Sequence, residues 1–189
     1  MSLVELIGQA DERGLAASGL ACLDRCVPLL GGDDEILRPL WAELADDTGD
    51  AWGERLEQVR AKLGTVGEPG AEEPGADEAV ALAHRMLADA PASRSAGELR
   101  AWADACSVAA LRIHRLLDPL GGTSPVDAPR EGRTEGVSPL VAAELRRQTK
   151  VLELLAAHGP SGLRPALDVS TEGRRVLRAV VSRRSRRRA

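Results

Sequence analysis

The chain contains neither phenylalanine nor tyrosine, and three tryptophans are its only large aromatic residues. Isoleucine is also scarce, whereas leucine and alanine abound. Aromatic and β-branched residues favour strands, while leucine and alanine are good helix formers. The composition therefore excludes an all-β fold and predicts an all-α protein. With 43% hydrophobic residues among 189, the chain can bury a core without disulfides or a structural metal.

Cysteine is also rare. The three cysteines, Cys22, Cys26 and Cys106, are an odd number and too few for a disulfide scaffold, as is typical of a reducing compartment. The longest nearly apolar stretch, 15–23, is much shorter than the roughly 20 residues of a membrane-spanning helix. The first residues lack the basic region of a secretory signal. The sequence predicts a cytoplasmic protein with no transmembrane segment, and its strong preference for arginine over lysine favours a bacterial, high-GC origin.

Large apolar residues recur at every third or fourth position in several segments, as on one face of a helix. The clearest predicted helices cover residues 96–118 and 138–158, and we expect these two to form the strongest, antiparallel pairing. Four short helices are predicted in the first 63 residues. The first begins at a capping box of Ser2 and Glu5 and ends at Gly14, and the second should end or kink before Pro28.

Segments rich in glycine and proline divide the chain. Residues 64–76 are predicted to form a solvated linker between an N-terminal sub-bundle, 1–63, and a C-terminal sub-bundle, 77–173. Residues 119–136 predict a long loop, and residues 174–189 an arginine-rich tail. The pattern predicts a bundle of about six or seven helices, in two sub-bundles or around one core. We favour one shared core, because four short helices would bury little on their own.

The two halves of the chain carry opposite charge. The first 100 residues hold 20 acidic and 9 basic side chains, and the remaining residues hold 9 acidic and 16 basic ones. Clustered arginines can neutralise phosphates and release their counterions. The tail could instead dock on the acidic half or lie on a membrane surface. If it contacts phosphate or another polyanion, the residues predicted to do so are Arg183, Arg184, Arg186, Arg187 and Arg188.

Three patterns resemble metal sites in part. Residues 46–50 match the DDxxD form that holds magnesium in isoprenoid diphosphate enzymes, but the glycine inside the motif favours a helix break. Residues 46–57 resemble the calcium loop of an EF-hand, with an alanine where its sharp turn needs glycine. The cysteines lack the short paired spacing of a zinc site, so we interpret them as buried thiols and predict no metal and no cofactor. The histidines that could complete a zinc site are His84, His114 and His158.

The sequence carries no glycine-rich phosphate loop, no nucleophile elbow and no HExxH motif. This pattern favours a non-enzymatic helical module that binds a protein partner, or a second copy of itself, through its helix faces. One alternative is a nucleic-acid-associated protein that binds phosphate through the arginine-rich tail. A second alternative is an enzyme or small-molecule binder with a pocket between helices, since such a pocket leaves no signature in one sequence.

Overall fold

The computed structural model describes residues 1–46, 48, 51–64, 74–119 and 125–186. Within these ranges every regular element is helical, which confirms the all-α fold. The elements are α1 (Leu3–Gln9), α2 (Glu12–Leu30), α3 (Arg38–Ala45), α4 (Trp52–Gly64), α5 (Pro74–Ala88), α6 (Ala96–Leu117), α7 (Asp127–Arg130), α8 (Pro139–His158), a 3-10 turn (Gly159–Gly162) and α9 (Leu163–Arg186).

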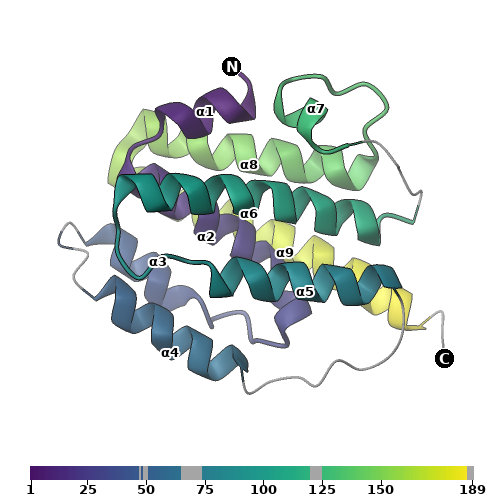
Figure 1. Cartoon of the computed structure of the whole chain (residues 1–189), viewed down its shortest axis with the longest axis horizontal. Coiled ribbons are helices and arrows are strands. Elements are labelled where there is room, and N and C mark those ends of the chain that lie inside the picture. The colour runs from purple at the N-terminus through teal and green to yellow at the C-terminus, as the bar shows by residue number, and fades with distance from the viewer. Residues whose placement is uncertain (47, 49–50, 65–73, 120–124, 187–189) are drawn as a thin grey trace.

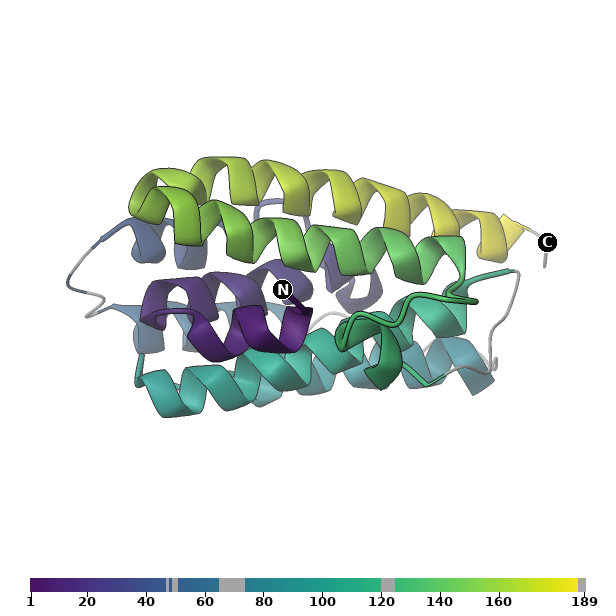
Figure 2. The ribbon, with the colours of Figure 1, turned by 90° about the horizontal axis from the view of Figure 1, so that it is seen from above.

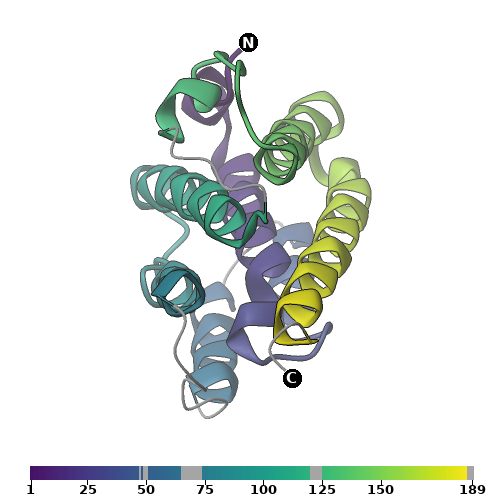
Figure 3. The same cartoon turned by 90° about the vertical axis from the view of Figure 1, so that its right-hand side faces the viewer.

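Helix α2 runs through the middle of the molecule (Figure 1). Figure 2 shows α8 and α9 in a layer on one side of α2 and α5 and α6 in a layer on the other, and the end-on view in Figure 3 shows the same arrangement. Every residue from 14 to 27 is buried, as expected of a helix that is covered on all sides. Helix α6 packs more extensively on α2 and α5 than on α8. The prediction that 96–118 and 138–158 form the strongest pairing is therefore wrong, because both pack around α2.

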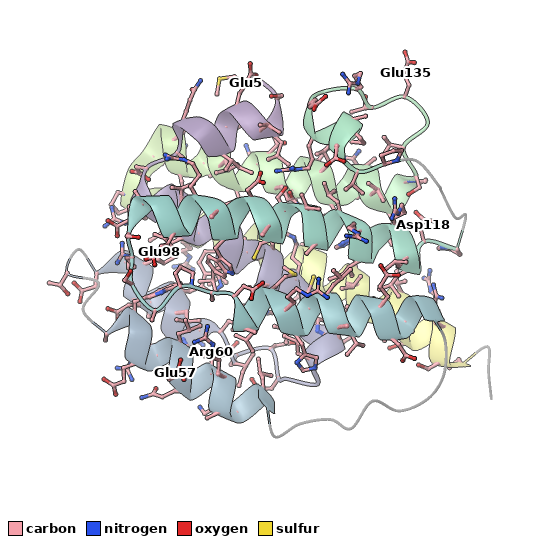
Figure 4. All side chains as sticks on the ribbon, in the orientation of Figure 1. Glu5, Glu57, Arg60, Glu98, Asp118 and Glu135 are labelled. Atoms are coloured by element: carbon pink, nitrogen blue, oxygen red, sulfur yellow. The ribbon has the colours of Figure 1, made fainter. Side chains whose placement is uncertain are left out.

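One continuous cluster of buried residues extends from Leu3 in α1 to Leu177 in α9. It includes Leu56 and Leu63 of α4 as well as Leu99 of α6, so the two halves of the chain share one core. Helix α4 is attached to the end of α5 by Arg60, whose Nη2 donates to the carbonyl oxygens of residues 88 and 90 at 2.8 and 2.7 Å (Figure 4). Residues 65–73 of the predicted linker lie outside the described part of the chain.

The boundary between the first two helices differs from the prediction. The capping box of Ser2 and Glu5 is present, but α1 ends at Gln9 and a second cap follows at Asp11, which accepts from the backbone N–H of Gly14 at 2.7 Å. Gly14 therefore lies in the first turn of α2. The helix also continues past Pro28 to Leu30. A proline inside a helix costs about 3 kcal/mol or more, and burial of large side chains on both sides of it, at about 1.5–3 kcal/mol each, offsets that cost.

The C-terminal segment is not a separate tail in the described residues. Helix α9 begins at Leu163 and extends to Arg186, so it includes most of the predicted tail. Leu177 is fully buried against the core, so the second half of α9 is held on the bundle. The region predicted as a loop contains the short helix α7, next to the buried Val126. Among the described residues, no helix combines the length and the apolar character needed to cross a bilayer.

Candidate functional site

A groove of about 270 Å³ lies between α5 and α6, which run side by side at the front of Figure 1. Its lining residues recur three or four positions apart, so they occupy one face of each helix. The indole N–H of Trp102 donates to the carbonyl oxygen of Met86 at 2.9 Å, which fixes the ring in the groove. The lining residues are Leu82, Arg85, Met86 and Asp89 from α5, and Trp102, Ala105, Cys106, Val108, Ala109 and Arg112 from α6.

The groove has an apolar floor and charged edges. Leu82 and Met86 are buried beside the indole, and burial raises the pKa of the Cys106 thiol well above its ordinary value, so that side chain is uncharged. At the edges, Arg85 is exposed and Arg112 is partly exposed, with Arg112 lying 3.4 Å from Glu78. The site therefore offers an apolar surface flanked by two guanidinium groups and by the carboxylate of the exposed Asp89.

A buried ion pair joins α2 to α8. Arg25 and Glu144 are both fully buried, and the Arg25 Nε and Nη2 atoms donate to the two carboxylate oxygens at 2.8 and 2.6 Å. Burial alone would raise the pKa of Glu144, but the charge of Arg25 and the hydrogen bonds from Arg25 and Gln148 more than offset this and hold the pKa below its ordinary value. Gly173 of α9 makes room for the pair, because a Cβ atom there would collide with the Arg25 side chain.

A chain of hydrogen bonds leads from this ion pair to the surface. Glu144 accepts from Gln148 Nε2 at 2.9 Å, and Gln148 Oε1 accepts from the Ser107 hydroxyl at 2.7 Å. Ser107 in turn accepts from Arg130 Nε at 3.1 Å, and Arg130 forms an ion pair with the half-exposed Asp104. Because the Ser107 proton goes to an amide oxygen and not to a base, the hydroxyl is not activated as a nucleophile. The network instead fixes the register of α6, α7 and α8.

His114 lies against the same ion pair and is fully buried. Its Nδ1 atom is 2.7 Å from the carbonyl oxygen of Ala110, so this nitrogen carries the ring proton, and its Nε2 atom is 3.5 Å from Glu144. Burial lowers the pKa of His114 below its ordinary value. The Glu144 carboxylate opposes this shift, and Arg25 and Arg147 add to it. The imidazole is therefore neutral at pH 7.

This buried imidazole predicts a pH-dependent stability. Because His114 binds a proton less readily in the folded state than in the unfolded chain, the free energy of unfolding should fall as pH drops below about 6.5, by up to about 1.4 kcal/mol per pH unit. Urea unfolding between pH 7.5 and 5.0 measures this slope. The lowered pKa of Glu144 acts only below that window. The slope should become much smaller in His114→Gln and persist in His158→Gln. An unchanged slope in His114→Gln would show that another group causes the pH dependence.

A second ion cluster fastens α9 to α2 and to the segment between α2 and α3. Asp24 of α2 is buried, accepts from the Trp41 indole N–H at 3.2 Å and pairs with Arg174 of α9. Burial raises the pKa of Asp24, and the arginine opposes that shift. Nearby, Asp34 pairs with Arg178 and lies 3.4 Å from Arg174 Nε. The basic half of α9 is therefore docked on acidic residues of the N-terminal half.

The arginines predicted to contact a polyanion differ in their exposure to solvent. Arg183 and Arg186 are exposed near the end of α9. Arg184 is partly buried, and its Nη1 donates to the carbonyl oxygen of Leu116 at the end of α6 at 3.1 Å. Arg187 and Arg188 lie outside the described residues.

The structure describes only some of the residues in the three sequence patterns that resemble metal sites. In the part of the chain that the structure describes, no group of three or more His, Cys, Asp or Glu side chains is arranged to hold an ion. The three cysteines are buried free thiols, as interpreted from the sequence, and burial raises the pKa of Cys22 to about 12. In the acidic segment, Asp46 accepts from the backbone N–H of Thr48 at 3.0 Å, while residues 47, 49 and 50 of both proposed motifs lie outside the described residues.

Sequence reasoning missed the groove and the buried ion pair. For the pair, a signal exists, because Arg25 lies within a run that is otherwise dominated by leucine, alanine and cysteine. A charged residue in a segment of that kind needs a buried partner. The groove has no comparable signal, since the apolar residues of its floor cannot be distinguished in the sequence from other core residues. No protein-family model, curated protein or solved structure gives a significant match to the chain.

Proposed function

We propose that the protein is a non-enzymatic interaction module that binds a short amphipathic helix of a partner protein in the groove between α5 and α6. The observation that carries this proposal is the apolar groove, in which the buried Met86 and Trp102 form the floor between the guanidinium groups of Arg85 and Arg112. Helix-in-groove recognition uses apolar anchors of this kind, spaced three and four residues apart on the partner.

The size and chemistry of the groove favour a side chain of a partner protein over a small-molecule metabolite as its ligand. Its volume of about 270 Å³ is below the roughly 300–1,000 Å³ of typical small-molecule pockets. Methionine and tryptophan are common at protein-binding surfaces, because methionine adapts its shape and tryptophan supplies a large contact area. Neither His84 nor His114 lines the groove, so it lacks the imidazole that acid–base chemistry would use.

The charges at the edges specify the partner further. Arg85 carries no ion pair among the described residues, and Arg112 has only the 3.4 Å contact with the exposed Glu78. An acidic residue beside the apolar anchors of the partner would pair with these guanidinium groups. The preferred ligand is therefore a helix that carries two or three large apolar residues on one face and at least one flanking carboxylate.

This preference can be tested with helical peptides displayed on phage and selected against the full chain. The selected peptides should share apolar residues at i, i+3 or i+4 and i+7 together with acidic residues beside them. The affinity of a fluorescein-labelled selected peptide should fall at least about tenfold, or about 1.4 kcal/mol, in Ala105→Arg, because the new side chain fills the groove. Fluorescence anisotropy measures both dissociation constants.

Ala157→Arg is the matched control, since Ala157 is also an exposed alanine and lies on α8, in the opposite layer. It should leave the affinity unchanged within about twofold. Equal binding by the Ala105→Arg protein, or a selected set without acidic residues, would contradict the proposal. If light scattering finds a dimer and Ala105→Arg abolishes it, the groove binds a second copy of the chain and not a different partner.

We also propose a cytoplasmic location in a bacterium. The three free, buried thiols support a reducing compartment. The dominance of arginine over lysine supports the bacterial origin.

A further inference from the structure

The exposed face of α9 changes its charge along the helix. In the first half this face carries mixed charge, from Arg164, Asp168 and Glu172. In the second half the exposed charged residues are all basic. At 100° per residue they fall on one side of the helix, and they are Arg175, Arg178, Arg183 and Arg186. We call these four residues the α9 stripe.

The α9 stripe is held on a rigid element and is only partly neutralised. Its first and last members are 11 residues apart, which at 1.5 Å per residue places them about 16 Å apart along the axis. Arg178 pairs with Asp34, whereas Arg175, Arg183 and Arg186 form no ion pair with any described residue. Figure 2 shows the end of α9 projecting at one end of the bundle, where an extended ligand can reach it.

The apolar residues of the same stretch do not favour a membrane surface. Leu177 is fully buried, and Val176, Val180 and Val181 are partly buried, with Val180 and Val181 packed against the core. An interfacial helix must insert an apolar face among the lipid chains. In α9 the apolar face is already packed against the core of the bundle. The exposed side can therefore bind anionic groups by electrostatic attraction but cannot insert into a membrane.

The residue types on α9 favour duplex nucleic acid among phosphate polyanions. The helix contains no aromatic residue, so it offers no platform on which unpaired bases could stack. Arginine binds phosphate oxygens in a bidentate manner. A duplex carries one negative charge per roughly 1.7 Å of its axis, more densely than a single strand, and its condensed counterions are released when a cation binds.

We propose that the second half of α9 binds the phosphate backbone of duplex nucleic acid, independently of base sequence, through Arg175, Arg183 and Arg186. This contact is separate from the groove between α5 and α6. Asp34 holds Arg178 and so limits the number of cations that are free to meet the duplex. Sequence specificity is not expected, because contacts with phosphates carry no base information.

The test uses the full chain and a fluorescein-labelled 20-base-pair duplex DNA, with anisotropy measured from about 50 to 200 mM NaCl. Each neutralised phosphate contributes about −0.9 to the slope of log K against log salt, so three arginines predict a slope of about −2.7. The triple variant Arg175→Gln/Arg183→Gln/Arg186→Gln should bind at least about tenfold more weakly at the lower salt and lose most of that slope.

The control variant Arg100→Gln/Arg133→Gln/Arg164→Gln makes the same change in net charge at exposed positions outside the α9 stripe, on α6, between α7 and α8, and in the first turn of α9. It should retain the affinity and the slope of the native chain. An equal loss in both variants would show that net charge, not the α9 stripe, drives binding. Failure of the native chain to bind the duplex at the lower salt would also overturn the proposal, as would binding to anionic vesicles but not to the duplex.

Discussion

Replacing Glu144 with glutamine is expected to lower the free energy of unfolding by about 3–5 kcal/mol, because it leaves the Arg25 guanidinium buried without a counter-charge. Both side chains are fully buried, so water cannot replace the lost carboxylate. The amide can accept only one of the two hydrogen bonds that Arg25 now donates. A single domain is stable by about 5–15 kcal/mol. Urea unfolding followed by circular dichroism should therefore find Glu144→Gln close to the limit of folding.

Two further variants separate this charge effect from a general effect of substitution in α8. Glu153 is exposed on the same helix, and Glu153→Gln should change the free energy by less than about 0.5 kcal/mol. The double variant Arg25→Met/Glu144→Leu removes both charges and should be more stable than Glu144→Gln, since replacing a buried ion pair with apolar residues is often neutral or stabilising. A double variant less stable than the single one would show that the side-chain shapes matter more than the charges.

Gly19→Ala is expected to destabilise the protein by about 1–3 kcal/mol, although alanine is the better helix former by about 1 kcal/mol. Gly19 lies in the middle of α2, where a Cβ atom would be 2.6 Å from two ring carbons of Trp102. The indole cannot easily move away, because its N–H is bonded to the Met86 carbonyl oxygen and its ring meets Trp52 edge to face, with centroids 6.3 Å apart. Thermal and urea unfolding both measure the loss.

Gly8→Ala is the matched control for this steric argument. Gly8 lies inside α1, and nothing is within 4 Å of the position that its Cβ atom would take. This substitution should stabilise the protein by about 0.5–1 kcal/mol through helix propensity alone. If Gly19→Ala were as favourable as Gly8→Ala, α2 and α6 would not approach as closely as described.

The sequence predicted local structure well where the relevant interactions are local. The capping box of Ser2 and Glu5 forms a helix start as expected, and the helix predicted over 96–118 begins at a cap in which Ser95 accepts from the backbone N–H of Glu98. Both caps depend on residues three positions apart. The central place of α2 could not be predicted in this way. Its apolar residues show a stripe on one face, but which other faces are covered depends on helices from distant parts of the chain.

The candidate site was less predictable for the same reason. Arg25 and Glu144 are 119 positions apart, and no local pattern pairs them. The sequence identified the arginine-rich segment correctly as a cluster but not its geometry. Helix formation to Arg186 turns Arg184 toward α6 and places Arg175 on the exposed side beside Arg183. The groove depends on small residues such as Ala105 and Ala109 on α6, which in the sequence resemble any other helical alanine.

The central claim is that a partner helix binds between α5 and α6, and the indole N–H signals of the three tryptophans in a nitrogen-15 NMR spectrum test it most directly. Trp102 lines the groove, whereas the Trp41 indole is bonded to Asp24 at the α2–α3 contact. Titration with a selected acidic helical peptide should shift the Trp102 signal and leave the Trp41 signal in place. A saturating peptide that shifts Trp41 and leaves Trp102 unchanged would contradict the claim.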